Sequence, residues 1–92
     1  MRTTSVCIAL DPNHLVHTLQ NEAVETLNHS GAEVVLDFSS VARIDPGAAR
    51  AMEELADLAE RASVQVVLRA VPIDIYRVLK CLRLAQRFAF LS

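Results

Sequence analysis

The 92-residue chain, at 10.1 kDa, is long enough for one domain, which we expect to span residues 1–92. Hydrophobic residues make up 52% of the sequence, which excludes intrinsic disorder, and aromatic residues only 4%, which predicts an aliphatic core. The net charge of −2 and the scarcity of aromatic residues argue against nucleic acid as a partner.

The N-terminal third predicts a strand followed by a helix. Residues 5–10 (SVCIAL) form the short apolar run of a strand. Asp11 is a helix-capping residue, Pro12 suits a first helical turn, and Gly31 is the expected stop. Between Pro12 and His29, four apolar residues recur at a spacing of four, which is one helical stripe: Leu15, Leu19, Ala23 and Leu27.

The central third contains two apolar strands and the clearest helix. Residues 33–38 (EVVLDF) predict a strand buried on both faces of a parallel sheet, and residues 64–68 (VQVVL) predict its counterpart. Between them, a helix is predicted from Pro46 to Ala62, with Asp45 as its cap. Its inward face is expected to contain Ala48, Ala51, Met52, Leu55, Ala59 and Ala62. Its outward face is expected to contain Arg50, Glu53, Glu54, Asp57, Glu60 and Arg61.

The C-terminal third predicts a helix from Pro72 to about Leu82 and a short strand over residues 87–91. The inward residues of this helix are expected to be Ile75, Val78, Leu79 and Leu82. Strands and helices therefore alternate along the whole chain. This order predicts an α/β fold with a single small open sheet of about four strands, mostly parallel, and right-handed crossovers.

Charge is divided unevenly along the chain. Residues 1–68 contain four basic and ten acidic side chains, whereas residues 69–92 contain five basic side chains and one acidic side chain. The basic C-terminal segment is either an ordinary solvated helix face or a docking surface for an acidic partner or a phosphate.

The cysteines and the hydropathy indicate the compartment. Cys7 and Cys81 lie far apart, with no paired cysteine motif and no signal peptide, so we expect two buried thiols in a cytoplasmic protein. The apolar runs are too short to cross a bilayer, so we expect no direct insertion into a membrane.

The loop over residues 39–48 is the candidate functional segment. In open α/β sheets, ligands bind where the carboxyl ends of strands meet helix N-termini. The start of a helix attracts anions, and Gly47 would allow a close approach. Pro46, however, lacks an N–H donor, and Asp45 already places negative charge there. From these residues alone, the loop is either capping structure or a binding site.

Residues 33–91 resemble the STAS domain, the fold shared by bacterial anti-sigma factor antagonists, stressosome proteins and the cytoplasmic tails of sulfate transporters. The family pattern is a strand ending in Asp-Leu-Ser, followed by Ile-Asp-Ser-Ser/Thr-Gly at the start of a helix. Asp37-Phe38-Ser39 matches the first part and Ile44-Asp45 the second, and Ala9-Leu10-Asp11 is similar to an earlier Gly-Glu-Leu-Asp element.

This sequence departs from the family pattern in one informative place. In phosphoregulated antagonists, a partner kinase phosphorylates a hydroxyl residue just after the Ile-Asp pair. Here Pro46 and Gly47 occupy those positions and Ala48 replaces the family glycine, so we expect no phosphorylation at Pro46 or Gly47. Nothing in the sequence marks the nearby Ser39 and Ser40 as substitutes.

A second departure concerns the edge of the sheet. The family usually has a further strand before the Gly-Glu-Leu-Asp element, for which the ten residues before Asp11 leave no room. The strand over residues 5–10 would then be an exposed edge. We therefore expect homodimerisation, or pairing with a partner strand, at this edge.

Metal binding and catalysis have little support in the sequence. His14 and His17 are three residues apart and His29 is distant, which does not provide the three or four ligands of a metal site. Asp37 and Asp45 are the only plausible pair of carboxylates, but their places suit a strand end and a helix cap. We expect no enzymatic activity and no cofactor.

The resemblance implies a non-catalytic, regulatory protein-interaction module similar to bacterial anti-sigma factor antagonists, whose partner is an anti-sigma factor or kinase-like ATPase. The alternative is a STAS subunit or domain that regulates a membrane transporter, either an anion permease or a phospholipid ABC-type system. A third hypothesis is a small nucleotide-binding regulator. The expected partner surface comprises Ser39, Ser40, Arg43, Asp45, Pro46, Gly47, Ala48, Arg50, Glu53 and Glu54.

Overall fold

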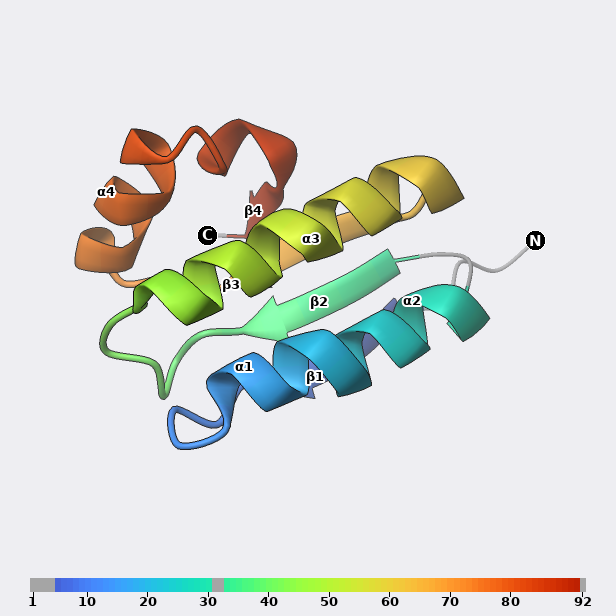
Figure 1. The fold of residues 1–92 in the computed structure, drawn as a ribbon, viewed down its shortest axis with the longest axis horizontal. Coiled ribbons are helices and arrows are strands. Elements are labelled where there is room, and N and C mark those ends of the chain that lie inside the picture. Colours follow the sequence, from blue (N-terminus) through green and yellow to red (C-terminus); the bar gives the residue numbers. More distant parts are fainter. Residues whose placement is uncertain (1–4, 31–32, 92) are drawn as a thin grey trace.

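Four parallel strands form the centre of the fold in a computed structural model, which describes residues 5–30 and 33–91 (Figure 1). They are β1 (Ser5–Ala9), β2 (Glu33–Asp37), β3 (Gln65–Arg69) and β4 (Ala89–Leu91). Their order across the sheet is β1-β2-β3-β4, and each pairs in parallel with the next. The predicted α/β class is therefore confirmed. Gly31, the expected stop of the first helix, lies outside the described residues.

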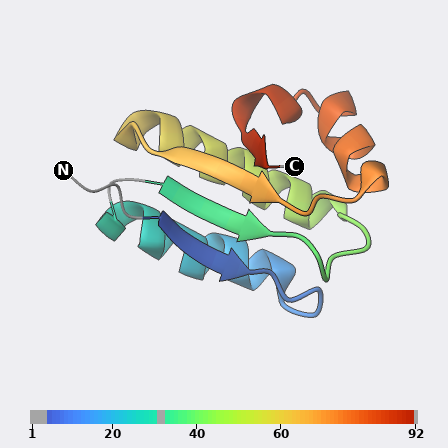
Figure 2. The ribbon, with the colours of Figure 1, turned by 180° about the vertical axis from the view of Figure 1, so that it is seen from behind.

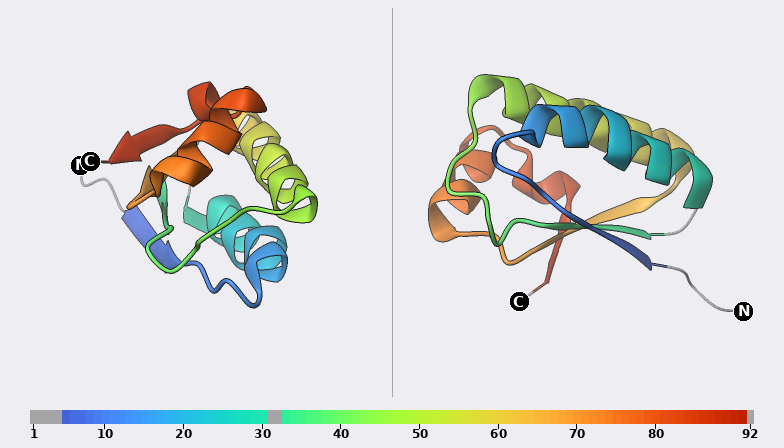
Figure 3. Two further views of the ribbon diagram at one scale, coloured as in Figure 1. Left: turned by 90° about the vertical axis from the view of Figure 1, so that its left-hand side faces the viewer. Right: turned by 90° about the horizontal axis from the view of Figure 1, so that it is seen from below.

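One face of the sheet carries the long helices. The first helix consists of α1 (Leu15–His17), the π-helical segment η1 (Thr18–Ala23) and α2 (Val24–Ser30), and the second is α3 (Pro46–Ala62). Both lie over the same face, as Figure 3 shows from below, and Figure 2 shows the opposite face without a helix. The core lies between these layers and includes Ile8, Val34, Leu36, Val66 and Leu68 from the strands. Val35 and Val67 lie on the opposite face and are also buried.

The first helix begins at Leu15, three residues later than predicted. An Asp11 carboxylate oxygen accepts from the Asn13 N–H at 2.9 Å, and the Asp11 carbonyl accepts from the His14 N–H at 3.0 Å. Asp11 therefore closes a turn before the helix and does not cap the helix itself, because its carboxylate and its carbonyl accept hydrogen bonds from residues 13 and 14, which precede the helix.

The π-helical segment has a physical explanation in the stripe spacing. Four residues advance about 40° past one α-helical turn, so a stripe at a spacing of four would drift away from the core. A π-helical turn is wider and removes part of this drift. As a result, all four stripe residues are buried: Leu15, Leu19, Ala23 and Leu27.

Helix α3 has the predicted bounds and the predicted cap. An Asp45 carboxylate oxygen accepts from the Ala48 N–H at 2.8 Å. The inward residues are buried as expected except for Ala62, which is exposed because the chain leaves the helix at Ser63 in the left-handed conformation. Ala56, which the stripe omitted, is buried.

The C-terminal segment contains α4 (Ile73–Cys81), the 3-10 turn η2 (Ala85–Arg87) and β4. The prediction that four residues of this helix face inward is wrong for two of them, one of which, Leu82, lies directly after α4. Ile75 and Leu79 are buried, but Val78 and Leu82 are 38% and 48% exposed. Helix α4 lies near the end of the sheet where the loop after β2 also runs (Figure 3), so only a narrow stripe of it meets the core.

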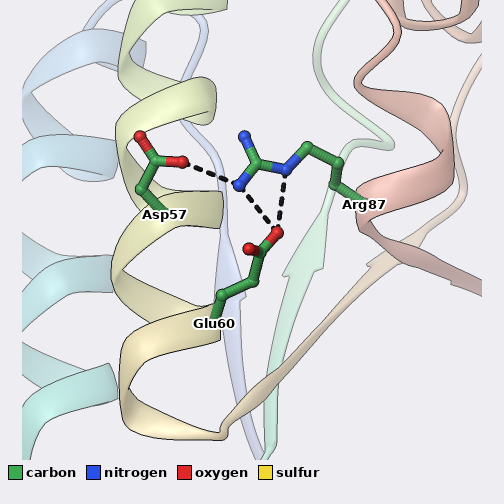
Figure 4. Close-up of polar contacts among 3 residues, drawn as sticks. All are labelled: Asp57, Glu60 and Arg87. Carbon is green, nitrogen blue, oxygen red and sulfur yellow. Dashed lines mark hydrogen bonds and ion pairs between the residues drawn. The ribbon is translucent and has the colours of Figure 1, made fainter.

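One side chain ties this segment to α3. The Nε and Nη2 atoms of Arg87 donate to the same Glu60 carboxylate oxygen, at 2.9 Å and 2.7 Å (Figure 4). Nη2 also donates to an Asp57 carboxylate oxygen at 2.7 Å. These bonds, first to Asp57 and then to Glu60, raise the pKa of Arg87 above its ordinary value. The two acidic residues lie on the predicted outward face of α3.

Candidate functional site

The loop between β2 and α3 is anchored by its apolar residues and exposes its hydroxyl residues. The Phe38 N–H donates to the Arg69 carbonyl at 2.9 Å, and the Val41 N–H donates to the Phe38 carbonyl at 2.9 Å. Phe38 and Val41 are buried, whereas Ser39 and Ser40 between them are exposed in a turn. The sheet therefore fixes the loop at its start while leaving both serines open to solvent.

Asp37 stabilises the start of this turn. One of its carboxylate oxygens accepts from the Ser39 N–H at 2.8 Å. This backbone hydrogen bond, then the Ser39 side chain and the nearby Arg69 charge, hold the pKa of Asp37 below its ordinary value of 3.8. The carboxylate is thus engaged in local structure, as is that of Asp45 at the start of α3.

The N-terminus of α3 is poorly suited to an anion. Pro46 has no N–H, the Ala48 N–H donates to the Asp45 carboxylate, and the Ala49 N–H donates to the Asp45 carbonyl at 2.9 Å. An anion needs free N–H groups at a helix start, and Asp45 already supplies the negative charge. The structure therefore favours the capping interpretation for these residues.

Gly47 lies inside the first turn of α3 and not in a loop turn. A Cβ atom at this position would lie 3.5 Å from an Asp45 carboxylate oxygen and 3.7 Å from a methyl carbon of Val16, which are ordinary contacts. The fold therefore does not require glycine here, and a small side chain fits.

A groove of about 380 Å³ lies between the first half of α3 and the second half of α4. Its polar lining comes from Asp45, Arg50 and Glu53, and its apolar lining comes mainly from Val78, Leu82 and Leu84. Ile44, Pro46 and Ala49 complete it. We call this surface the α3–α4 groove. It combines exposed aliphatic side chains with charges of both signs, which is typical of a protein-binding surface.

The structure brings together four of the ten predicted partner-binding residues, namely Asp45, Pro46, Arg50 and Glu53, in this groove. Five others are exposed but do not line it: Ser39, Ser40, Arg43, Gly47 and Glu54. Ala48 is fully buried against the core, so its side chain is not part of any surface.

Sequence reasoning missed the apolar half of the groove. Val78 and Leu82 have the spacing of a buried stripe, and that spacing is the same whether the stripe meets the protein core or a partner. Residues 75, 78, 79 and 82 share one helical face within two turns, so the sequence contains no signal that separates the two cases.

The cysteine prediction is wrong for both residues. Cys7 pairs with Val35, which places its side chain on the sheet face without a helix, and it is exposed there because β1 is an edge strand. Cys81 is exposed on α4. Both thiols are free. His14 and His17 are exposed too, and within residues 5–30 and 33–91 no three His, Cys, Asp or Glu side chains are grouped as a metal site would require.

The chain belongs to the STAS domain family, because the family model described as "Mlab, STAS domain" matches residues 9–91. A solved structure supports the fold assignment. It is a Thermotoga maritima protein described as a candidate anti-sigma factor antagonist, with a TM-score of 0.79 and 14% identity. The match covers 99% of this chain and 83% of that one. A search of the curated proteins finds no match.

None of the helices in the described part of the chain combines the length and the apolar character needed to cross a bilayer.

Proposed function

We propose that this STAS domain is a non-catalytic regulatory module of the anti-sigma factor antagonist type, acting over residues 1–92 as one unit and binding a protein partner through the α3–α4 groove. The observation that carries the proposal is the pair Val78 and Leu82, which are exposed beside Arg50 and Glu53. Family membership and the shared fold support a regulatory module in general.

The composition of the groove suggests how a partner is recognised. Covering the exposed parts of Val78 and Leu82 would contribute on the order of 1 kcal/mol each from apolar burial. Arg50 and Glu53 at the rim would select the register and the partner more than they add affinity. A suitable partner therefore inserts an aliphatic side chain and carries charges of both signs beside it.

The module is proposed to bind without the usual phosphorylation switch, either constitutively or under the control of a ligand. Pro46, Gly47 and Ala48 have no hydroxyl group. Incubation with ATP and candidate kinases, followed by peptide mass spectrometry, is expected to find no phosphate within residues 39–48. Gly47→Ser is the matched positive control, because a Cβ atom at this position makes only ordinary contacts and serine restores a hydroxyl at a family position. Phosphate on wild-type Ser39 or Ser40 would contradict this part of the proposal.

The proposed partner is an anti-sigma factor or kinase-like ATPase in the cytoplasm, and the alternative partner is a transporter subunit. We also retain the proposal that β1 supports a homodimer or a partner strand, because it pairs only with β2 among the described residues. Light scattering tests the homodimer, and a monomer at high concentration would contradict it.

The groove is tested by affinity capture from the source organism with two matched variants. Arg50→Glu and Arg61→Glu make the same charge change at exposed positions of the same helix, but only Arg50 lines the groove. The proposal expects Arg50→Glu to lose the partner that wild type and Arg61→Glu retain. Equal recovery of the partner with all three proteins would refute partner binding at the α3–α4 groove. The identity of the captured protein separates the sigma-factor partner from the transporter subunit.

A further inference from the structure

The exposed apolar side chains of this protein are concentrated in its C-terminal quarter. Among the described residues, six large hydrophobic side chains are exposed, and all lie in or directly after α4 or in β4: Ile73, Tyr76, Val78, Leu82, Phe90 and Leu91. Val78 and Leu82 belong to the α3–α4 groove. The other four are not explained by the proposed function.

Two of these four, Tyr76 and Phe90, line a second hollow of about 290 Å³, formed by α4, η2 and β4. Their rings meet edge to face, with centroids 5.3 Å apart and planes at 77°. Lys80, Arg83, Ala85 and Gln86 complete the lining. We call this hollow the α4–β4 pocket. It contains two cations and no acidic side chain, and both cations are exposed.

The α4–β4 pocket lies on the opposite flank of α4 from the groove. Tyr76 and Val78 are two residues apart, as are Lys80 and Leu82, and two residues turn about 200° around a helix. The first member of each pair lines the pocket and the second lines the groove. Helix α4 therefore has a separate hollow on each side of its buried stripe.

We propose that the α4–β4 pocket is a second protein-docking site, which binds an acidic peptide segment of a partner. An aromatic or aliphatic side chain of that segment packs on Tyr76 and Phe90. Its flanking carboxylates pair with Lys80 and Arg83. The excess of basic residues in positions 69–92 adds a positive field that steers such a segment toward the pocket.

A peptide fits the observations better than an anionic bilayer does. A flat lipid surface is best met by apolar side chains that protrude, and here the two rings line a hollow beside the cations. Ile73, at 63% the most exposed of the six large hydrophobic side chains named above, is not in the pocket lining. A peptide side chain can enter the hollow while its carboxylates reach the rim.

The proposal is tested by selecting peptides from a random display library on the immobilised full chain and titrating a selected peptide by fluorescence anisotropy. We expect the selected sequences to be rich in Asp and Glu around one aromatic or aliphatic residue. Lys80→Glu is expected to weaken binding at least about tenfold, and added salt should weaken it further. Arg61→Glu is the control for net charge, and Leu82→Glu is the control for the α3–α4 groove. The dissociation constant of the peptide for each control should stay within about twofold of the wild-type value.

Three outcomes would overturn the proposal. Selected peptides without acidic residues would exclude recognition of carboxylates by Lys80 and Arg83. An equal loss of peptide affinity in Lys80→Glu and Arg61→Glu would show that the effect comes from net charge and not from the pocket. The third outcome is that no peptide is selected, while the wild-type protein sediments with phosphatidylglycerol vesicles and the Lys80→Glu variant does not. This outcome would identify a lipid surface as the ligand instead. Because Lys80 is exposed, circular dichroism should show an unchanged fold in this variant. The outcome is independent of the Arg50→Glu experiment, so the two sites can fail separately.

Discussion

Three residues other than glycine hold left-handed backbone in the described part of the chain: Ser63, Ala70 and Arg83, with φ of 57°, 56° and 61°. Ser63 ends α3, and the following Val64 N–H donates back to the Ala59 carbonyl at 2.9 Å while the Val64 side chain is buried. This is the arrangement in which helices prefer glycine, because a Cβ atom destabilises the left-handed conformation.

Ser63→Gly is therefore expected to raise the free energy of unfolding by roughly 0.5–1 kcal/mol, as measured by urea titration. Ala62→Gly, one residue earlier and inside the helix, is the control and should lower it by up to about 1 kcal/mol. A Ser63→Gly variant less stable than wild type would mean that the left-handed turn is not formed in solution.

Asp37 gives the fold a pH dependence of defined sign. Its pKa is lowered in the folded state, first by the Ser39 backbone, so its contribution to stability is complete above its ordinary pKa of 3.8. That contribution is lost as the pH falls through the lowered folded value. The melting temperature of Asp37→Asn should therefore lie below that of wild type near neutral pH, with a gap that narrows below about pH 4. A gap that stays constant down to acid pH would contradict this role.

At the scale of elements, one side chain joins two segments. Arg87 of η2 bonds both Asp57 and Glu60 of α3, so it connects the C-terminal end of the chain to the main helix. The acidic partners are half or more exposed, which limits the value of these bonds in water.

Arg87→Met should therefore lower the free energy of unfolding by about 1 kcal/mol at low salt and by less at high salt. Arg61→Met is the control, since Arg61 has no ion pair among the described residues, and it should change stability little. The same loss at low and high salt would show that Arg87 stabilises the fold through packing of its alkyl chain and not through charge.

The elements differ in how far sequence predicts them. Helix α3 was predicted to the residue, because Asp45 and Pro46 mark its start and its amphipathic pattern is long. The first helix was predicted to start too early, because Asp11 and Pro12 suit a tight turn as well as a helix start. For the helix containing α4, the position along the chain and the burial of Ile75 and Leu79 were predicted, but not the exposure of Val78 and Leu82, because all four residues have the spacing of one stripe.

At the scale of the whole molecule, the groove arises from the position of α4 relative to α3. Arg50 and Leu82 are far apart in sequence, and no local pattern places them in one site. The polar half of the groove was predicted, because it follows the loop at the end of β2, where α/β proteins bind their ligands. The apolar half required the structure. The exposure of Cys7 also required it, since alternation along a strand does not reveal which face a helix covers.

The same topology gives α4 two exposed flanks, which we propose as docking surfaces. The α3–α4 groove and the α4–β4 pocket share this helix but no residue. A regulatory module with two such surfaces can contact two proteins, or two segments of one protein, at the same time. Both surfaces include exposed aliphatic or aromatic groups, and apolar groups that gather on a protein surface are typical of interaction sites.

The most direct test of the α3–α4 groove compares two leucines of nearly equal exposure. Leu82, 48% exposed, lines the groove, and Leu91, 53% exposed, lies in β4 outside it. Calorimetric titration of the captured partner into Leu82→Glu and Leu91→Glu gives the affinity of each. The groove predicts a loss of at least about tenfold for Leu82→Glu and a near wild-type affinity for Leu91→Glu, because a carboxylate buried without a partner is costly. Equal affinities for the two variants would contradict docking at the α3–α4 groove.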